Sequence, residues 1–161
     1  MNSGNIKNLN SLLESEYMAI NSFEALIKHA TALPIKTELQ KIQQTHKQHT
    51  LLISTKILDL GGSPSGSIGI QGVVSETISN IKHIGTTGTT SYLNEALQGE
   101  FMAIKTINAL IADNSVFNNS TILYNIIANH KTNIDSLNTI INTSIDVKWF
   151  FILLPKKLGT N

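Results

Sequence analysis

The chain has 161 residues, long enough for one domain with a substantial core, and its 12 basic and 11 acidic residues give a formal net charge of +1. It contains no cysteine, which excludes disulfides, thiolate catalysis and thiolate-bound metals. All the basic residues are lysines, and because no lysine cluster replaces the planar fork of arginine, we expect no nucleic-acid partner.

The first predicted helix opens a hairpin that spans about residues 6–60. Apolar residues recur from Leu9 to Ile27 at spacings of three and four, which define one face of a helix. Glu16 falls in the middle of that face, where a buried apolar residue is expected. His29 stands near the end of the helix, where a cation interacts favourably with the helix dipole, so we interpret it as structural.

The second predicted helix runs from Leu39 to Leu60 and stops at Gly61-Gly62. Its apolar face is interrupted in the centre by His46 and His49. Because these two histidines are three residues apart, they lie on one face of the helix and can converge on one ion.

The turn between these helices, near Thr31–Ile35, is short, so the two helices should be antiparallel. With a rise of about 1.5 Å per residue, Glu16 on the first helix and the two histidines on the second should reach similar depth in the bundle.

A long crossover follows, over residues 61–90. Val73 to Ile84 has weak amphipathic spacing, which predicts a short extra helix that stops at Gly85. His83 lies just before this stop and is interpreted as structural. Neither glycine-rich stretch has the Gly-Lys-Ser/Thr ending of a phosphate-binding loop.

The second hairpin, about residues 91–143, repeats the first. The segment Glu16-Tyr17-Met18-Ala19-Ile20 recurs 84 residues later as Glu100-Phe101-Met102-Ala103-Ile104. The predicted third helix, Leu93–Ile111, again carries a glutamate in the middle of its apolar face. These matches predict an internal duplication.

The predicted fourth helix, Leu123–Ile141, follows a short turn at 113–120 and repeats the polar interruption of the second helix. His130 lies 84 residues after His46, and Asn133 lies 84 residues after His49. The repeat and the antiparallel pairing predict one layer of buried polar residues: Glu16, His46, His49, Glu100, His130 and Asn133.

A buried carboxylate costs several kcal/mol unless it is paired or coordinates a metal. Carboxylate oxygen and neutral imidazole nitrogen together suit Fe, Mn or Zn, so the layer predicts a divalent metal site. The alternative is a metal-free polar layer, in which Glu16 and Glu100 accept hydrogen bonds from His46, His49 and His130 and fix the register of the helices.

Three segments resemble a known family. Leu12 to Asn21 resembles the first helix of bacterioferritin, His46 to Gly62 resembles its second, and Asn133 to Leu137 resembles its fourth, with asparagine in place of histidine. The crossover and Gly99-Glu100 are more similar to an uncharacterised bacterial family of ferritin-like domains of unknown function. The resemblance implies an all-α, ferritin-like antiparallel four-helix bundle over residues 1–144, with a long crossover that carries a short extra helix.

The site residues that differ from the ferritin-like di-iron pattern determine the predicted function. Ferritin-like di-iron sites use Glu-x-x-His on helices two and four, but here His46 and His130 stand at the bridging positions, and a neutral imidazole cannot bridge two ions. Two glutamates balance the charge of one divalent ion. We therefore predict a metal-binding protein with one Fe, Zn or Mn ion and a role in metal handling or stress. The alternatives are a di-iron-type oxidoreductase or ferroxidase, and a metal-free structural or interaction module.

The C-terminal segment, residues 145–161, is predicted to be a separate apolar tail. Lys148 to Lys157 is strongly apolar but too short to span a bilayer. We expect it to pack against the bundle or a second copy, with a homodimer formed through the bundle surface or residues 147–154. Contact with a membrane interface is the less favoured alternative. The N-terminal residues are polar and lack a signal core, so we expect a cytoplasmic protein. The resemblance to the ferritin-like family implies a bacterial one.

Overall fold

The computed structural model describes residues 2–66, 89–112, 117 and 120–153, with side chains described for 3–66, 91–112, 117 and 120–143. Four helices make up almost all of this part of the chain: α1 (Asn2–His29), α2 (Leu33–Asp59), α4 (Thr89–Ala112) and α5 (Thr121–Leu153). The described residues contain no strand. The predicted all-α four-helix bundle is confirmed. The predicted extra helix at 73–84 lies outside the described residues.

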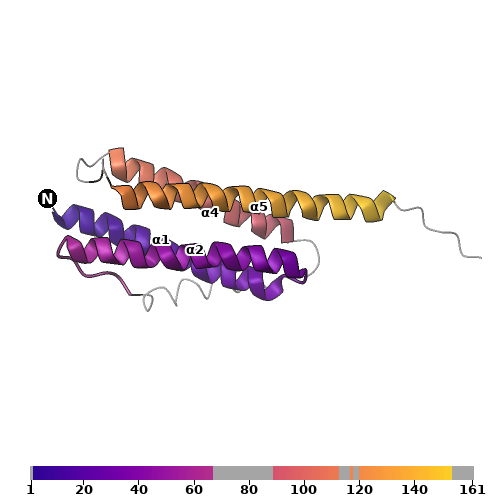
Figure 1. Ribbon diagram of the computed structural model, residues 1–161, viewed down its shortest axis with the longest axis horizontal. Coiled ribbons are helices and arrows are strands. Elements are labelled where there is room, and N and C mark those ends of the chain that lie inside the picture. Colours follow the sequence, from indigo (N-terminus) through magenta and orange to yellow (C-terminus); the bar gives the residue numbers. More distant parts are fainter. Residues whose placement is uncertain (1, 67–88, 113–116, 118–119, 154–161) are drawn as a thin grey trace, which may run out of the picture.

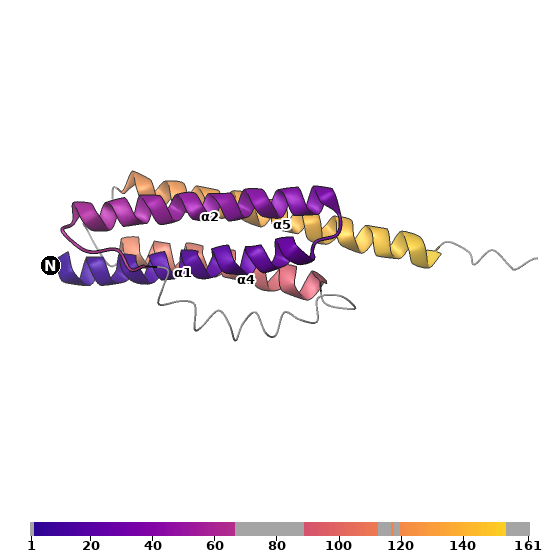
Figure 2. The same ribbon diagram turned by 90° about the horizontal axis from the view of Figure 1, so that it is seen from below.

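The helices form two antiparallel hairpins that pack against each other (Figure 1). Helix α1 pairs with α2 and α4 pairs with α5, while α1 also contacts α4 and α2 also contacts α5. Figure 2 shows that α2 ends at the opposite end of the bundle from the start of α4, so these two helices run in the same direction. Each helix therefore presents its inner face to two neighbours.

The ends of α2 follow from local chemistry. The helix has a proline in its first turn, where the missing backbone N–H needs no partner. At its C-terminus Gly61 adopts a positive φ of 78°, and the N–H groups of Gly61 and Gly62 donate to the carbonyls of Leu58 and Ile57, both at 2.9 Å. This is the Schellman arrangement, which glycine allows without strain. The predicted glycine stop is where α2 ends.

The buried apolar residues form two main clusters, one on either side of the polar layer. One cluster contains Leu9, Leu13, Ile53 and Ile107 and lies toward the start of α1. The other lies toward the start of α2. Its members include Phe23, Leu39, Ile42, Leu93, Leu97, Ile134 and Leu137. These are largely the apolar positions that recur at spacings of three and four, so the helical periodicity identified the core.

Helix α5 extends beyond the other helices (Figure 1). It continues to Leu153, so residues 145–153 of the predicted tail prolong this helix. The boundary at 144 and the packing of the tail stay predictions. None of the described helices is both long and apolar enough to cross a membrane.

Candidate metal centre

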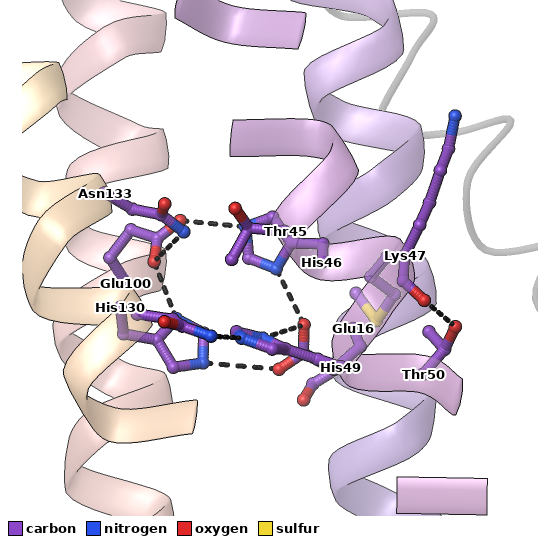
Figure 3. Close-up of polar contacts among 12 residues, drawn as sticks. Glu16, Thr45, His46, Lys47, His49, Thr50, Glu100, His130 and Asn133 are labelled. Carbon is purple, nitrogen blue, oxygen red and sulfur yellow. Dashed lines mark hydrogen bonds and ion pairs between the residues drawn. The ribbon is translucent and has the colours of Figure 1, made fainter. Parts of the chain in front are cut away.

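All six predicted site residues lie in one layer in the middle of the bundle (Figure 3). Each is almost fully buried, with exposed fractions between 0% and 4%. One or two come from each helix: Glu16 from α1, His46 and His49 from α2, Glu100 from α4, and His130 and Asn133 from α5.

Four of these side chains alternate carboxylate and imidazole in a closed ring. His46 Nδ1 lies 2.7 Å from Glu16 Oε2, and His46 Nε2 lies 2.9 Å from Glu100 Oε1. His130 Nδ1 lies 2.6 Å from Glu100 Oε2. The ring closes between His130 Nε2 and Glu16 Oε1 at 3.3 Å, a contact that lacks hydrogen-bond geometry. Both ring nitrogens of both histidines therefore face carboxylate oxygens.

The other two predicted residues each bind one of the carboxylates from outside the ring. His49 Nδ1 lies 3.2 Å from Glu16 Oε2, and Asn133 Nδ2 donates to Glu100 Oε2 at 3.2 Å. Glu16 contacts His46 and His49 of α2, and Glu100 contacts His130 and Asn133 of α5. Each residue of the second set lies 84 positions after its counterpart in the first set. This repetition supports the duplication, which remains an inference.

A further contact was missed by the sequence reasoning. Asn129, a half-buried residue of α5, has its Nδ2 atom 3.2 Å from His49 Nε2. If the amide donates, His49 Nε2 accepts and His49 Nδ1 carries the proton that faces Glu16. The residue 84 positions before Asn129 is Thr45, so the repeat gave no signal for this asparagine.

The carboxylates of the ring stay charged. Burial disfavours the charged form of Glu16, but the close contact with His130 and the hydrogen bonds from His46 and His49 outweigh burial and hold its pKa well below 4.5. The pKa of Glu100 is also lowered, because hydrogen bonds from His130 and His46 outweigh its burial.

The pKa values of the two histidines in the ring are raised instead of lowered. Burial favours neutral imidazole, yet hydrogen bonds to Glu100 and Glu16 raise the pKa of His46 to about 9. The same two carboxylates raise the pKa of His130. At neutral pH the ring without a metal therefore holds two carboxylates and the imidazolium of His46, and the raised pKa of His130 favours the charged form of that side chain as well.

The donor set also fits one divalent ion. One nitrogen from each of His46, His49 and His130 can be chosen so that all three lie within 4.8 Å of one another. Metal–nitrogen bonds of about 2.0–2.1 Å keep the nitrogens around one ion within about 4.2 Å, so only small side-chain shifts are needed. A divalent ion would take the place of protons on these imidazoles, and its two positive charges would balance the two carboxylates.

Comparison with known proteins identifies the family of the chain. Residues 5–113 match the family model described as "Domain of unknown function (DUF2383)". A search of curated proteins gave no match. Among solved structures, the chain is similar to the bacterioferritin-related protein from Bacteroides fragilis, a dodecameric thioferritin, with a TM-score of 0.71 and 19% identity over 94% of this chain and 92% of that chain. That likeness confirms the predicted ferritin-like fold. Because the family model spans most of the sequence, the chain belongs to the DUF2383 family.

Proposed function

We propose that this protein binds one divalent metal ion, Fe, Zn or Mn, in the core of its bundle and serves in metal handling or the response to stress. The observation that carries the proposal is the convergence of three histidine nitrogens within 4.8 Å beside two buried glutamates. A bound ion at this position would supply Lewis-acid or redox chemistry, depending on the metal.

The position of His46 favours one ion over two. Its ring contacts Glu16 through one nitrogen and Glu100 through the other, so it lies between the carboxylates, where a ferritin-like di-iron site would have a bridging glutamate. Among the residues that the structure describes, the layer contains two carboxylates, enough to balance one divalent ion.

The contacts around His49 resemble the support that metal-bound histidines usually have. Such histidines hold their second ring nitrogen in a hydrogen bond, which fixes the tautomer and the direction of the ligand atom. Both nitrogens of His49 have a partner in the layer, Glu16 on one side and Asn129 on the other. An ion bound by His49 would replace one of these contacts, and the remaining one would still orient the ring.

The direct test is elemental analysis of untagged protein, with the metal measured per chain. We expect about one Fe, Zn or Mn per chain, lost together with metal-linked thermal stabilisation in the double variant His46→Ala/His49→Ala. His29→Ala is the matched control, because His29 is exposed at the end of α1. Stoichiometric metal retained by the double variant would contradict the proposal. Two irons per chain and Fe(II) oxidation faster than in buffer would instead indicate a di-iron oxidoreductase.

A metal-free structural layer is the second candidate, and the closed ring is the observation that favours it. In the ring of Glu16, His46, Glu100 and His130, the raised pKa values of the two histidines favour imidazoliums, which offset the two carboxylates without an ion. In that case the melting temperature would not respond to added or removed metal, and the layer would serve to fix the register of the helices.

Association between copies of the chain is also part of the proposal. The similar protein from Bacteroides fragilis is a dodecamer. We infer self-association through the bundle surface or through residues 147–154. Sedimentation analysis of the full chain and of a chain truncated before residue 147 would separate these two surfaces.

A further inference from the structure

A cavity of about 930 Å³ leads from the molecular surface to the polar layer between α1 and α4. We call it the α1–α4 groove. Glu16, His46, Glu100 and His130 line its inner part, whereas His49 and Asn133 are not among its lining residues. Met18 and Met102 also line it and are 44% and 57% exposed, so the groove is open to solvent at these residues. Figure 2 shows α1 and α4 side by side along this face.

The two walls of the groove, one from α1 and one from α4, are lined by corresponding residues of the two repeats. Most residues of α1 that line the groove have a counterpart in the sequence, 84 positions later in α4, that also lines the groove. These pairs include Met18 with Met102, Ala19 with Ala103, and Ser22 with Thr106. The groove therefore lies where the two hairpins meet, between corresponding faces of α1 and α4, and the two glutamates lie at its centre.

The chemistry of the walls favours a neutral ligand. They combine apolar surface, such as Phe23 and Leu26, with the hydroxyl groups of serine and threonine. Outside the polar layer, Glu95 is the one charged side chain among the described lining residues, and no lysine is among them. An anion would meet no countercharge there. The volume is at the upper end of the range of about 300–1,000 Å³ that small-molecule sites have.

We propose that the α1–α4 groove binds a small neutral organic molecule whose nitrogen, oxygen or sulfur atom coordinates the core metal ion from the side of Glu16 and Glu100. This inference rests on the proposed metal site. It adds that the ion has an exchangeable ligand, and that this ligand arrives through one face of the bundle.

Gly99 offers a way to block the groove without disturbing the core. It lines the groove in α4, and a Cβ atom built on it meets nothing within 4 Å. Gly99→Trp should place its indole in the groove and, because glycine is a poor helix former, should leave α4 intact. Gly4→Trp is the matched control, since Gly4 is also helical, also has open space around its Cβ, and does not line the groove.

The experiment uses the full chain loaded with Co²⁺ and follows the visible absorption of the ion during titration with 4-phenylimidazole, a neutral nitrogen donor with an apolar body. We expect saturable binding to the unmodified protein and to Gly4→Trp. In Gly99→Trp the affinity should fall by about tenfold or more, because the indole occupies the space of the phenyl group, while the cobalt stoichiometry stays the same.

Each other outcome overturns a stated part of the inference. If cobalt binds but Gly99→Trp takes up 4-phenylimidazole as the unmodified protein does, the groove is not the ligand site, although the metal site stands. If azide binds more tightly than 4-phenylimidazole, the preference for a neutral ligand is wrong. If the unmodified protein binds no cobalt, the proposed metal site fails, and the ligand site fails with it.

Discussion

Each glutamate of the layer binds side chains from both hairpins. Within its own hairpin, Glu100 accepts hydrogen bonds from His130 and Asn133, and from the other hairpin it contacts His46. The contacts between the two hairpins fix the position of α1 and α2 relative to α4 and α5. Loss of one carboxylate should therefore affect the stability of the whole bundle as well as metal binding.

Glu100→Gln should destabilise the metal-free protein by about 3 kcal/mol at neutral pH, because the buried His46 and His130 would each lose a carboxylate partner. Glu38→Gln is the matched control. Glu38 pairs with Lys41 at 2.6 Å on the surface of α2, and exposed pairs of this kind contribute about 0–1 kcal/mol. Urea unfolding of both variants measures the difference. Equal losses in the two variants would mean that the ring does not hold the hairpins together.

With the ion on His49 Nδ1, His49 Nε2 carries the ring proton and donates it to the amide oxygen of Asn129 once that amide turns over, so Asn129 is a positioning residue in the proposed centre. Asn129→Ala should weaken Zn²⁺ binding by about 10–100-fold, as loss of such supporting hydrogen bonds usually does. Asn125→Ala, an exposed change one turn earlier on α5, should leave the affinity unchanged. Competition with a chromophoric chelator gives both values. A similar affinity in both variants would show that Asn129 does not orient His49.

At the level of the helices, α2 depends on its C-terminal glycines. Gly61 has a φ of 78°, which a residue with a Cβ adopts at a cost, and Gly62 lies so close to α1 that an added Cβ would be 2.7 Å from a methyl carbon of Ile6. These two glycines end the helix and let the following chain pass against the start of α1. Asn10 of α1 also binds this chain, because its side-chain oxygen accepts from Ser65 N at 2.7 Å.

Gly61→Ala should lower the free energy of unfolding by about 1–2 kcal/mol, the cost of a left-handed conformation for an L-residue. Gly4→Ala should leave stability unchanged or raise it by up to about 1 kcal/mol, because Gly4 lies in α1 with open space around it. Thermal unfolding distinguishes the two. A neutral Gly61→Ala would mean that the Schellman turn relaxes into another ending.

At the level of the whole molecule, the fold and the members of the polar layer could be predicted because they depend on periodicity. A glutamate or histidine in the middle of an apolar helical face is visible in the sequence, and two antiparallel helices bring such residues to one depth. Hydrogen bonds between the glutamates and histidines were predicted as an alternative to a metal site, but the closure of these contacts into a ring, the contact of Asn129 and the α1–α4 groove could not be predicted. They depend on side-chain directions and on the spacing between helices, which no one-dimensional pattern records. Phe117, fully buried in the short connection before α5, was missed for the same reason.

The charged ring also makes the stability of the whole metal-free molecule depend on pH. The pKa of His46 rises from 6.5 to about 9 on folding, so its contribution is fully present below pH 6.5 and is lost as the pH rises through about 9. The pKa of His130 also rises, so its contribution is likewise present below pH 6.5 and is lost as the pH rises through the raised value. The pKa values of Glu16 and Glu100 fall below 4.5, so their contribution is present above pH 4.5 and is lost as the pH falls through the lowered values. In chelator, the melting temperature should be highest between about pH 4.5 and 6.5 and should decrease toward alkaline pH.

A bound divalent ion should reverse this alkaline trend, because the ion competes with protons for the ring nitrogens of His46 and His130. The increase in melting temperature caused by one equivalent of Zn²⁺ should therefore grow between about pH 6 and 9. His46→Gln removes one titrating nitrogen donor and should flatten both the decline in chelator and the rise with Zn²⁺. If the curves with and without Zn²⁺ coincide at every pH, the layer is the metal-free structural ring, since a ring that binds no ion responds to protons alone.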